Sequence, residues 1–170
     1  MQGDPQLLAQ LDDAAREKIQ WLLDRETEYL DQGRYPEWLA LYAADCTYWV
    51  PAVPGQVDAV DHVSLFFEDR ALMEMRIARL TGGDAHSLEL PLRVSHVTGP
   101  ALLAGIDSET GEVQVTRRFQ ATEYQDRRTR DFAGLFTYYV TPVNDAWRIR
   151  TKRVDLVDCD GPFEPLQVFI

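Results

Sequence analysis

Histidine and cysteine are the side chains here that could bind a metal ion, and the sequence holds few of them. The three histidines are His62, His86 and His96, and two histidines with one carboxylate are enough to ligate a mononuclear iron. Two of these histidines fall in predicted loops and one in a predicted strand, so their spacing gives no sign of convergence. Cys46 and Cys159 each lack a nearby histidine, whereas a Rieske iron–sulfur cluster needs two cysteines and two histidines in paired spacing. The sequence therefore predicts no metal site and no cofactor site in this chain.

Acid–base chemistry in a pocket is the catalytic alternative. Asp45, Tyr48, Asp69 and His96 carry the groups that a dehydratase or isomerase would use if a helical layer and a curved sheet enclosed them. No pair of them has a diagnostic spacing. The structural alternative is that Asp69 pairs with an arginine, Tyr48 packs, and His96 forms a hydrogen bond within the sheet. Glycine-rich phosphate loops and the G-x-S-x-G serine motif are missing, so no catalytic motif supports another reaction.

The elements that would position these residues are clearest in the second half of the chain. Residues 112–124, 134–141 and 146–157 read as consecutive antiparallel strands with one apolar and one polar face. The turn chemistry of residues 142–145 joins the last two strands as a hairpin. The apolar residues of the last strand change parity, which predicts a bulge near Lys152 and Arg153.

The first half of the chain predicts helices. A stripe at three- and four-residue spacing predicts one long amphipathic helix in the first thirty residues, ending near Gly33. Its members are Leu8, Leu11, Ala15, Ile19, Leu22, Leu23, Glu26 and Leu30. Pro36 opens a short second helix, and a strand at 46–51 and a loop at 52–61 follow. That loop could cover an opening or contact another chain.

A third helix is predicted over residues 63–80, with Ser64 as a possible cap and residues 81–84 as its end. Residues 85–90 read as irregular, and 92–103 as a strand that forms a hairpin with residues 112–124. Helices followed by a meandering antiparallel sheet favour an α+β fold in which the N-terminal helices cover a curved sheet.

Composition limits the function classes. A chain of 170 residues, 45% hydrophobic and 26% charged, predicts a single domain over 1–170. The net charge of −11 argues against nucleic-acid and anionic-membrane partners. There is no apolar run long enough to cross a bilayer and no secretory pattern, so we expect a cytoplasmic protein. The apolar end of the chain, with Phe169 and Ile170, should dock either on its own domain or in a subunit interface.

Taken in order, several segments resemble the small (β) subunits of aromatic-ring-hydroxylating dioxygenases. The segments are YPEWLALY at 35–42, DCTYWVP at 45–51, EDR at 68–70, RIARL at 76–80, PLRVSH at 91–96, FAG at 132–134 and WRI at 147–149. The resemblance implies a cone like that of nuclear transport factor 2 and scytalone dehydratase. Leu92 and Asp158 depart from the residues that this family often has there, and residues 83–90 match poorly.

The same resemblance implies a role in aromatic compound catabolism as a mainly structural subunit. Its partner would be a large α subunit that carries the Rieske cluster and a mononuclear iron, commonly in an α3β3 hexamer with β–β contacts, and a reductase would deliver electrons from NAD(P)H. No cofactor is expected in this chain. The candidates for subunit contacts are Asp69, Arg70, Arg79, Arg93, Phe169 and Ile170.

Overall fold

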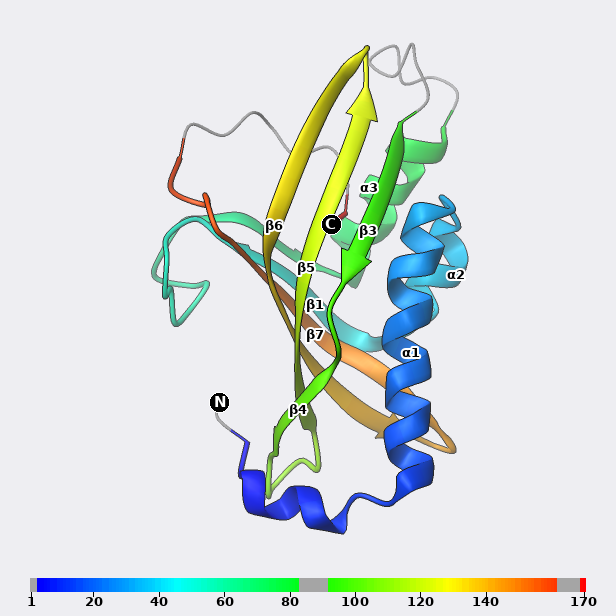
Figure 1. Ribbon diagram of the computed structural model, residues 1–170, viewed down its shortest axis with the longest axis vertical. Helices are drawn as coiled ribbons and strands as arrows, with labels where there is room; N and C mark the ends of the chain where they lie inside the picture. Colours follow the sequence, from blue (N-terminus) through cyan, green and yellow to red (C-terminus); the bar gives the residue numbers. More distant parts are fainter. Residues whose placement is uncertain (1–2, 83–91, 162–168) are drawn as a thin grey trace.

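A computed structural model describes residues 3–82, 92–161 and 169–170, and it consists of helices packed on one face of a curved sheet (Figure 1). The first half contains the 3-10 helix η1 (Pro5–Gln10), the α-helices α1 (Asp13–Asp31), α2 (Tyr35–Leu39) and α3 (Arg70–Thr81), and the strands β1 (Tyr42–Pro51) and β2 (Ser64–Asp69). The second half contains β3 (Arg93–Thr98), β4 (Leu102–Ile106), β5 (Val113–Gln125), β6 (Arg128–Val143) and β7 (Ala146–Leu156).

The described strands form one sheet in the order β2-β1-β7-β6-β5-β3, with β4 also paired to β5. All neighbouring pairs are antiparallel except β1 and β7, which are parallel. The expected antiparallel sheet is therefore corrected to a mixed one. A parallel pair needs a long connection, and every element from β2 to β6 lies between β1 and β7 in the chain.

The predicted three-strand meander is confirmed as β5, β6 and β7. Strand β6 begins at Arg128 instead of residue 134, because β5 and β6 are joined by a two-residue turn. Asp126 and Arg127 both have positive φ, at 50° and 62°, which is the backbone of the tight hairpin turns that match strand twist. Asp126 and Arg127 lack the glycine that usually marks such a turn. The sequence pattern therefore predicted the start of this strand too late.

Strand β7 contains the predicted bulge, but at Arg150 and not at Lys152 and Arg153. Ile149 pairs with Val140 and Thr151 with Tyr139, which leaves Arg150 without an opposite residue. The extra residue changes the parity of the strand, so Ile149 and Lys152 both face the covered side of the sheet.

The prediction of one long N-terminal helix is wrong at its start. Helix η1 ends at Gln10, and α1 begins anew at Asp13 with Asp12 as its N-cap, whose Oδ1 accepts a 2.7 Å hydrogen bond from the Ala15 amide. An aspartate directly before a helical run is a strong start signal, and Asp12 divides the apolar stripe in two. The end near Gly33 is confirmed, since α1 ends at Asp31 and Gly33 has a φ of +66°.

The third predicted helix is wrong over its first seven residues, 63–69. Ser64–Asp69 form the edge strand β2, in which Phe67 pairs with Trp49 of β1. Asp69, not Ser64, caps α3, since its Oδ1 accepts a 2.9 Å hydrogen bond from the Leu72 amide. The predicted strand at 92–103 is two strands with Pro100 between them, and the stretch 85–90 lies outside the described residues.

The two faces of the sheet differ. Helices α1, α2 and α3 lie against one face and enclose the core, which we call the interior of the cone (Figure 1). Phe169 and Ile170 are each only 1% exposed and belong to this core, so the end of the chain docks on its own domain. Among the described helices, none lies against the opposite, outer face, whose residues include Val97, Arg118 and Arg153.

Candidate functional site

A buried carboxylate with four hydrogen-bond donors lies in the interior of the cone. Glu26 Oε1 accepts from Lys152 Nζ at 2.7 Å, from Trp38 Nε1 at 2.8 Å and from the Tyr42 hydroxyl at 3.0 Å. Glu26 Oε2 accepts from the Tyr138 hydroxyl at 3.1 Å. Glu26 and Lys152 are both 0% exposed. We call these five residues the Glu26 cluster, in which all four donors are bound to the one carboxylate.

Local structure explains how these groups reach the interior. Glu26 lies on the apolar stripe of α1, one turn from Leu22 and Leu23 and one turn from Leu30. Lys152 follows the bulge at Arg150 and therefore points inward with Ile149. Trp38 and Tyr42 come from α2 and the start of β1, and Tyr138 from β6. The cluster thus links α1 to α2 and to the strands β1, β6 and β7.

The electrostatics of the cluster favour the ionised form of Glu26. Burial opposes ionisation of Glu26, but the charge of Lys152 and the hydrogen bonds from Lys152 and Trp38 outweigh burial and leave the pKa of Glu26 below its ordinary value. Burial lowers the pKa of Lys152, and Glu26 partly offsets that effect. Burial and then the Glu26 charge raise the pKa of the Tyr42 and Tyr138 hydroxyls, which therefore stay protonated as donors.

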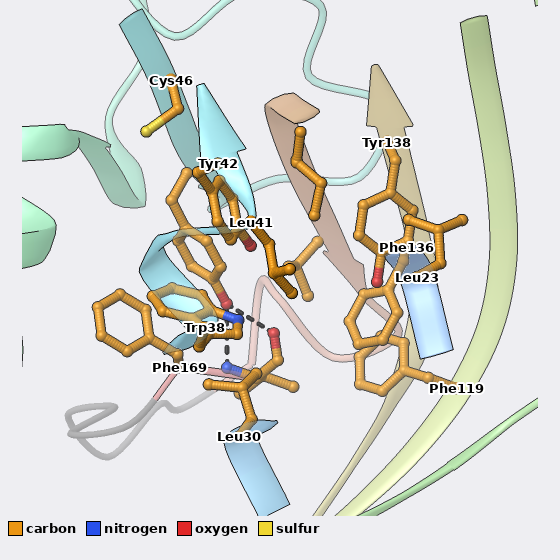
Figure 2. Close-up of a cluster of buried hydrophobic side chains, with 14 of the residues drawn as sticks. Leu23, Leu30, Trp38, Leu41, Tyr42, Cys46, Phe119, Phe136, Tyr138 and Phe169 are labelled. Atoms are coloured by element: carbon orange, nitrogen blue, oxygen red, sulfur yellow. Dashed lines mark hydrogen bonds between the residues drawn. The ribbon is translucent and has the colours of Figure 1, made fainter. Parts of the chain in front are cut away.

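The end of the chain fills the neighbouring part of the interior. The Phe169 ring lies 4.4 Å from the Trp38 ring and 5.3 Å from the Tyr48 ring, between centroids (Figure 2). The Tyr48 hydroxyl donates to the Ile170 carbonyl at 2.8 Å and accepts from the Ile170 amide at 3.0 Å. Phe136 packs against Tyr138 of the Glu26 cluster, with ring centroids 5.8 Å apart, and Phe119 stacks on Phe136 at 3.8 Å. Aromatic side chains and ion-paired groups thus occupy the interior.

The four residues proposed for acid–base chemistry do not come together. Tyr48 is 1% exposed and holds Ile170, and burial raises its pKa far above the ordinary value. Asp69 caps α3, and Asp45 lies 3.1 Å from Arg150. His96 Nδ1 lies 2.6 Å from Asp31 Oδ1, which links β3 to the end of α1. Asp45 and Asp69 do line one surface hollow of about 490 Å³, but Tyr48 and His96 are not part of it.

Sequence reasoning missed the Glu26 cluster. Glu26 falls on the apolar stripe of the predicted first helix. An acidic residue at such a position is a signal for a buried partner, because a carboxylate on a buried face requires one. Lys152 gave no comparable signal, since its direction depends on the position of the bulge.

Metal-ligating side chains do not gather in the described part of the chain. No group of three or more histidine, cysteine, aspartate or glutamate residues there could hold an ion. His62 lies 3.5 Å from Asp58 in the exposed loop, His96 binds Asp31, and His86 lies outside the described residues. Cys46 and Cys159 are buried free thiols. In the same ranges, no helix is long and apolar enough to span a membrane.

Most of the six candidates for subunit contacts have partners within the chain. Arg70 donates to Glu74 and reaches three backbone carbonyls at the end of α2 and the start of β1, each at 3.4 Å. Asp69 caps the same helix, and Phe169 and Ile170 are buried in the core. Arg79 is exposed on the last turn of α3. Arg93 is exposed on β3, with its guanidinium 4.6 Å from the Tyr124 ring. Arg79 and Arg93 therefore present their charges to solvent.

Comparison with known proteins identifies the fold and the family. Among solved structures, the beta subunit of a benzoate 1,2-dioxygenase from Burkholderia mallei has a TM-score of 0.67 and 25% identity, covering 86% of this chain and 91% of that one. A scytalone dehydratase candidate from Novosphingobium aromaticivorans has a TM-score of 0.62 and 17% identity, covering 85% of both chains. These likenesses confirm the expected α+β cone.

Sequence relatives agree with the structural neighbours. The small oxygenase component of the p-cumate 2,3-dioxygenase system of Pseudomonas putida is 27% identical over 140 residues, which are 81% of this chain and 77% of the relative. The beta subunit of toluate 1,2-dioxygenase from P. putida is 31% identical over 145 residues, which are 82% and 88% of the two chains. A sequence profile described as "Ring hydroxylating beta subunit" matches residues 25–160, and the chain therefore belongs to this family of ring-hydroxylating beta subunits.

Proposed function

We propose that this chain is a structural subunit that takes no direct part in catalysis and supports the large α subunit of a ring-hydroxylating dioxygenase. The observation that carries the proposal is the Glu26 cluster, in which the buried carboxylate is bound by Lys152, Trp38, Tyr42 and Tyr138. A general acid or base must have a free site for a substrate proton, and Glu26 has four donors already. The interior is built to hold the fold together.

The partner and its cofactors follow from the family. The p-cumate and toluate relatives are named as parts of dioxygenase systems, which supports the same setting here. We propose that a large α subunit supplies the Rieske cluster and mononuclear iron, that a reductase passes electrons from NAD(P)H, and that three copies of each subunit assemble as α3β3 in the cytoplasm. The ring substrate would bind in the large subunit.

Arg79 and Arg93 are the charged candidates for contact with a partner, because both are exposed. Reversing either charge, as in Arg79→Glu or Arg93→Glu, should reduce the amount of large subunit that copurifies with the chain while its circular dichroism spectrum stays unchanged. Lys18→Glu is a matched control, since Lys18 is exposed on α1 and outside the candidate set. Full recovery of the large subunit with both variants would remove these two arginines from the interface.

The decisive experiment is gentle purification of the tagged chain from its native cell, with polypeptide content, mass and visible spectrum recorded together. A red-brown complex with a larger chain is the expected result. A colourless chain that is isolated alone and converts a substrate without added iron would instead support a stand-alone dehydratase- or isomerase-type enzyme of the same fold. Stoichiometric iron in the isolated chain would also overturn the proposal.

A further inference from the structure

Strand β3 forms one edge of the sheet, and a helix of the same chain covers that edge. The strand order places β2 at one end and β3 at the other, so among the described strands each has a neighbour on one side only. An open strand edge presents amide and carbonyl groups that a further strand can pair with, and proteins cover or charge such edges to prevent this. Helix α1 runs alongside β3, and its last residue, Asp31, reaches the middle of the strand (Figure 1).

The register of β3 shows which of its amides point to the open side. In an antiparallel pair, every second residue turns its amide and carbonyl toward the partner strand, and the residues between turn theirs away. The Gly99 amide, just beyond β3, donates to the Arg118 carbonyl of β5 at 2.9 Å, so the odd-numbered residues of β3 face β5. Val94, His96 and Thr98 therefore face the open side, with His96 at the centre.

The carboxylate of Asp31 occupies this central position. The His96 amide donates to Asp31 Oδ1 at 3.1 Å and to Asp31 Oδ2 at 3.0 Å, and His96 Nδ1 lies 2.6 Å from Asp31 Oδ1. A carboxylate only accepts hydrogen bonds, so His96 Nδ1 carries a proton and donates it. One side chain of α1 thus binds both the backbone and the ring of the same residue of β3.

The ring of His96 is fixed by its surroundings. The His96 side chain is 1% exposed, and the ring centroid lies 6.4 Å from that of Phe136 in the core. The other ring nitrogen, Nε2, has no hydrogen-bond partner among the described residues, so Asp31 is the polar group that orients the imidazole. The buried ring in turn holds the Asp31 carboxylate against the edge of β3.

Asp31 is an unfavourable residue for the helix that it ends. The C-terminal end of a helix carries a partial negative charge, which favours basic side chains and disfavours acidic ones in the last turn. Asp31 is the last residue of α1, and that turn contains no basic residue. Helix stability therefore does not explain an aspartate here. Asp24, two turns earlier, gives α1 another polar link to the sheet, since Arg117 Nη2 of β5 donates to Asp24 Oδ1 at 2.8 Å.

We propose that Asp31 blocks the addition of a further strand at the edge of β3. Its carboxylate occupies the central amide of the open side, so an extended chain cannot pair there until the end of α1 moves away. A strand that did approach would also remove this charge from water without a partner, which is costly. The contact acts within one chain, so the inference does not depend on the proposed function.

Hydrogen exchange and analytical ultracentrifugation of the full chain test this role. Asp31→Ala should speed exchange of the His96 amide by roughly tenfold or more, because a hydrogen bond to a charged group is lost, and should give larger species than the wild type at equal concentration. Asp31→Asn keeps an acceptor oxygen and should stay close to the wild type. Asp24→Ala is the matched control, since it removes the other link from α1 and leaves the His96 amide bound. Equal exchange and equal sedimentation for Asp31→Ala and Asp24→Ala would overturn the proposal.

A proline distinguishes strand pairing from other aggregation. Val94→Pro removes an amide on the open side of β3 and leaves the pairing with β5 intact, so adding it to Asp31→Ala should abolish the larger species. Their persistence would show that they form elsewhere, and the proposal would be wrong. If the variants do not fold, exchange in the wild type decides the question. The His96 amide should then exchange as slowly as those of Ser95 and Val97, which face β5, and rapid exchange would overturn the proposal.

Discussion

Glu26 and Lys152 are the residues on which the interior depends most. Removing two charges from water costs several kcal/mol per ion, and a buried pair recovers that cost only where further hydrogen bonds satisfy the carboxylate. Here Trp38, Tyr42 and Tyr138 provide those bonds. The pair is therefore tolerated as a whole, whereas half of it would be an unpaired buried charge.

Single substitution of either charge should accordingly be severe. Lys152→Met or Glu26→Gln should each reduce the free energy of unfolding by about 3–5 kcal/mol, because the remaining charge loses its partner. The double variant Glu26→Gln with Lys152→Met should be more stable than either single variant, and chemical denaturation of all four chains measures the difference. Additive losses in the double variant would show that the two residues do not act as a pair.

The low pKa of Glu26 predicts a pH dependence. A carboxyl group whose pKa is lower in the folded state stabilises the fold above its ordinary pKa of 4.5, and that contribution is lost as the pH falls through the folded-state value. As the pH falls below 4.5, the wild-type chain should therefore lose more stability than the double variant Glu26→Gln with Lys152→Met, in which this contribution is missing. Denaturation at several pH values tests this, and parallel curves for the two chains would contradict it.

At the residue scale, the sequence predicted individual environments only in part. The prediction that Tyr48 packs agrees with the structure, in which Tyr48 is buried against Phe169 and binds Ile170. The hydrogen bond of His96 was expected within the sheet, but its partner is Asp31 of α1, and Asp69 caps α3 instead of pairing with an arginine. The Glu26 cluster could not be derived in full, because its members come from α1, α2, β1, β6 and β7. Only the fold brings them together, and one bulge decides that Lys152 points inward.

At the element scale, the start of α3 depends on one side chain. Asp69→Ala should reduce the free energy of unfolding by about 1 kcal/mol, since the Leu72 amide loses its acceptor, while Asp69→Asn should keep most of the stability. Thermal unfolding of the two variants measures the contrast. An equal loss of stability in the two variants would contradict this assignment of the cap.

The docked end of the chain is a second element that can be tested. Tyr48→Phe removes both hydrogen bonds to Ile170 and should cost about 1–2 kcal/mol, because each neutral hydrogen bond contributes roughly 1 kcal/mol. Phe169→Ala leaves a cavity beside Trp38 and should cost about 3–5 kcal/mol. Limited proteolysis should then cleave the end of the Phe169→Ala chain first. Unchanged stability in both variants would mean that the docked end contributes nothing to the fold.

Elements were predictable where local pattern and tertiary structure agree. The alternation of β5 and the hairpin of β6 and β7 follow from side-chain period and turn residues. Residues 64–69 were assigned to a helix because Leu65, Leu72, Met75 and Ile77 fit a helical stripe, yet pairing with β1 makes the segment a strand. Propensity is a weak guide at a sheet edge, because the partner strand supplies the backbone hydrogen bonds.

For the whole molecule, assembly should make stability depend on concentration. A fold stabilised by self-association has a Tm that rises with protein concentration, because binding favours the folded state by mass action. The Tm of the isolated chain should rise over a hundredfold range of concentration, because the proposed α3β3 assembly implies that the small chains contact one another. A constant wild-type Tm over that range would indicate a monomer.

The parallel pairing of β1 with β7 has a consequence for how the chain is made. During synthesis β1 emerges early, but its central neighbour β7 is the last of the described strands to emerge, so one edge of β1 stays open until then. Closing such a distant pair slows folding, and in the meantime the open edge can capture other nascent chains. Aggregation before β7 has been synthesised should therefore limit expression of this protein more than the stability of the finished fold does.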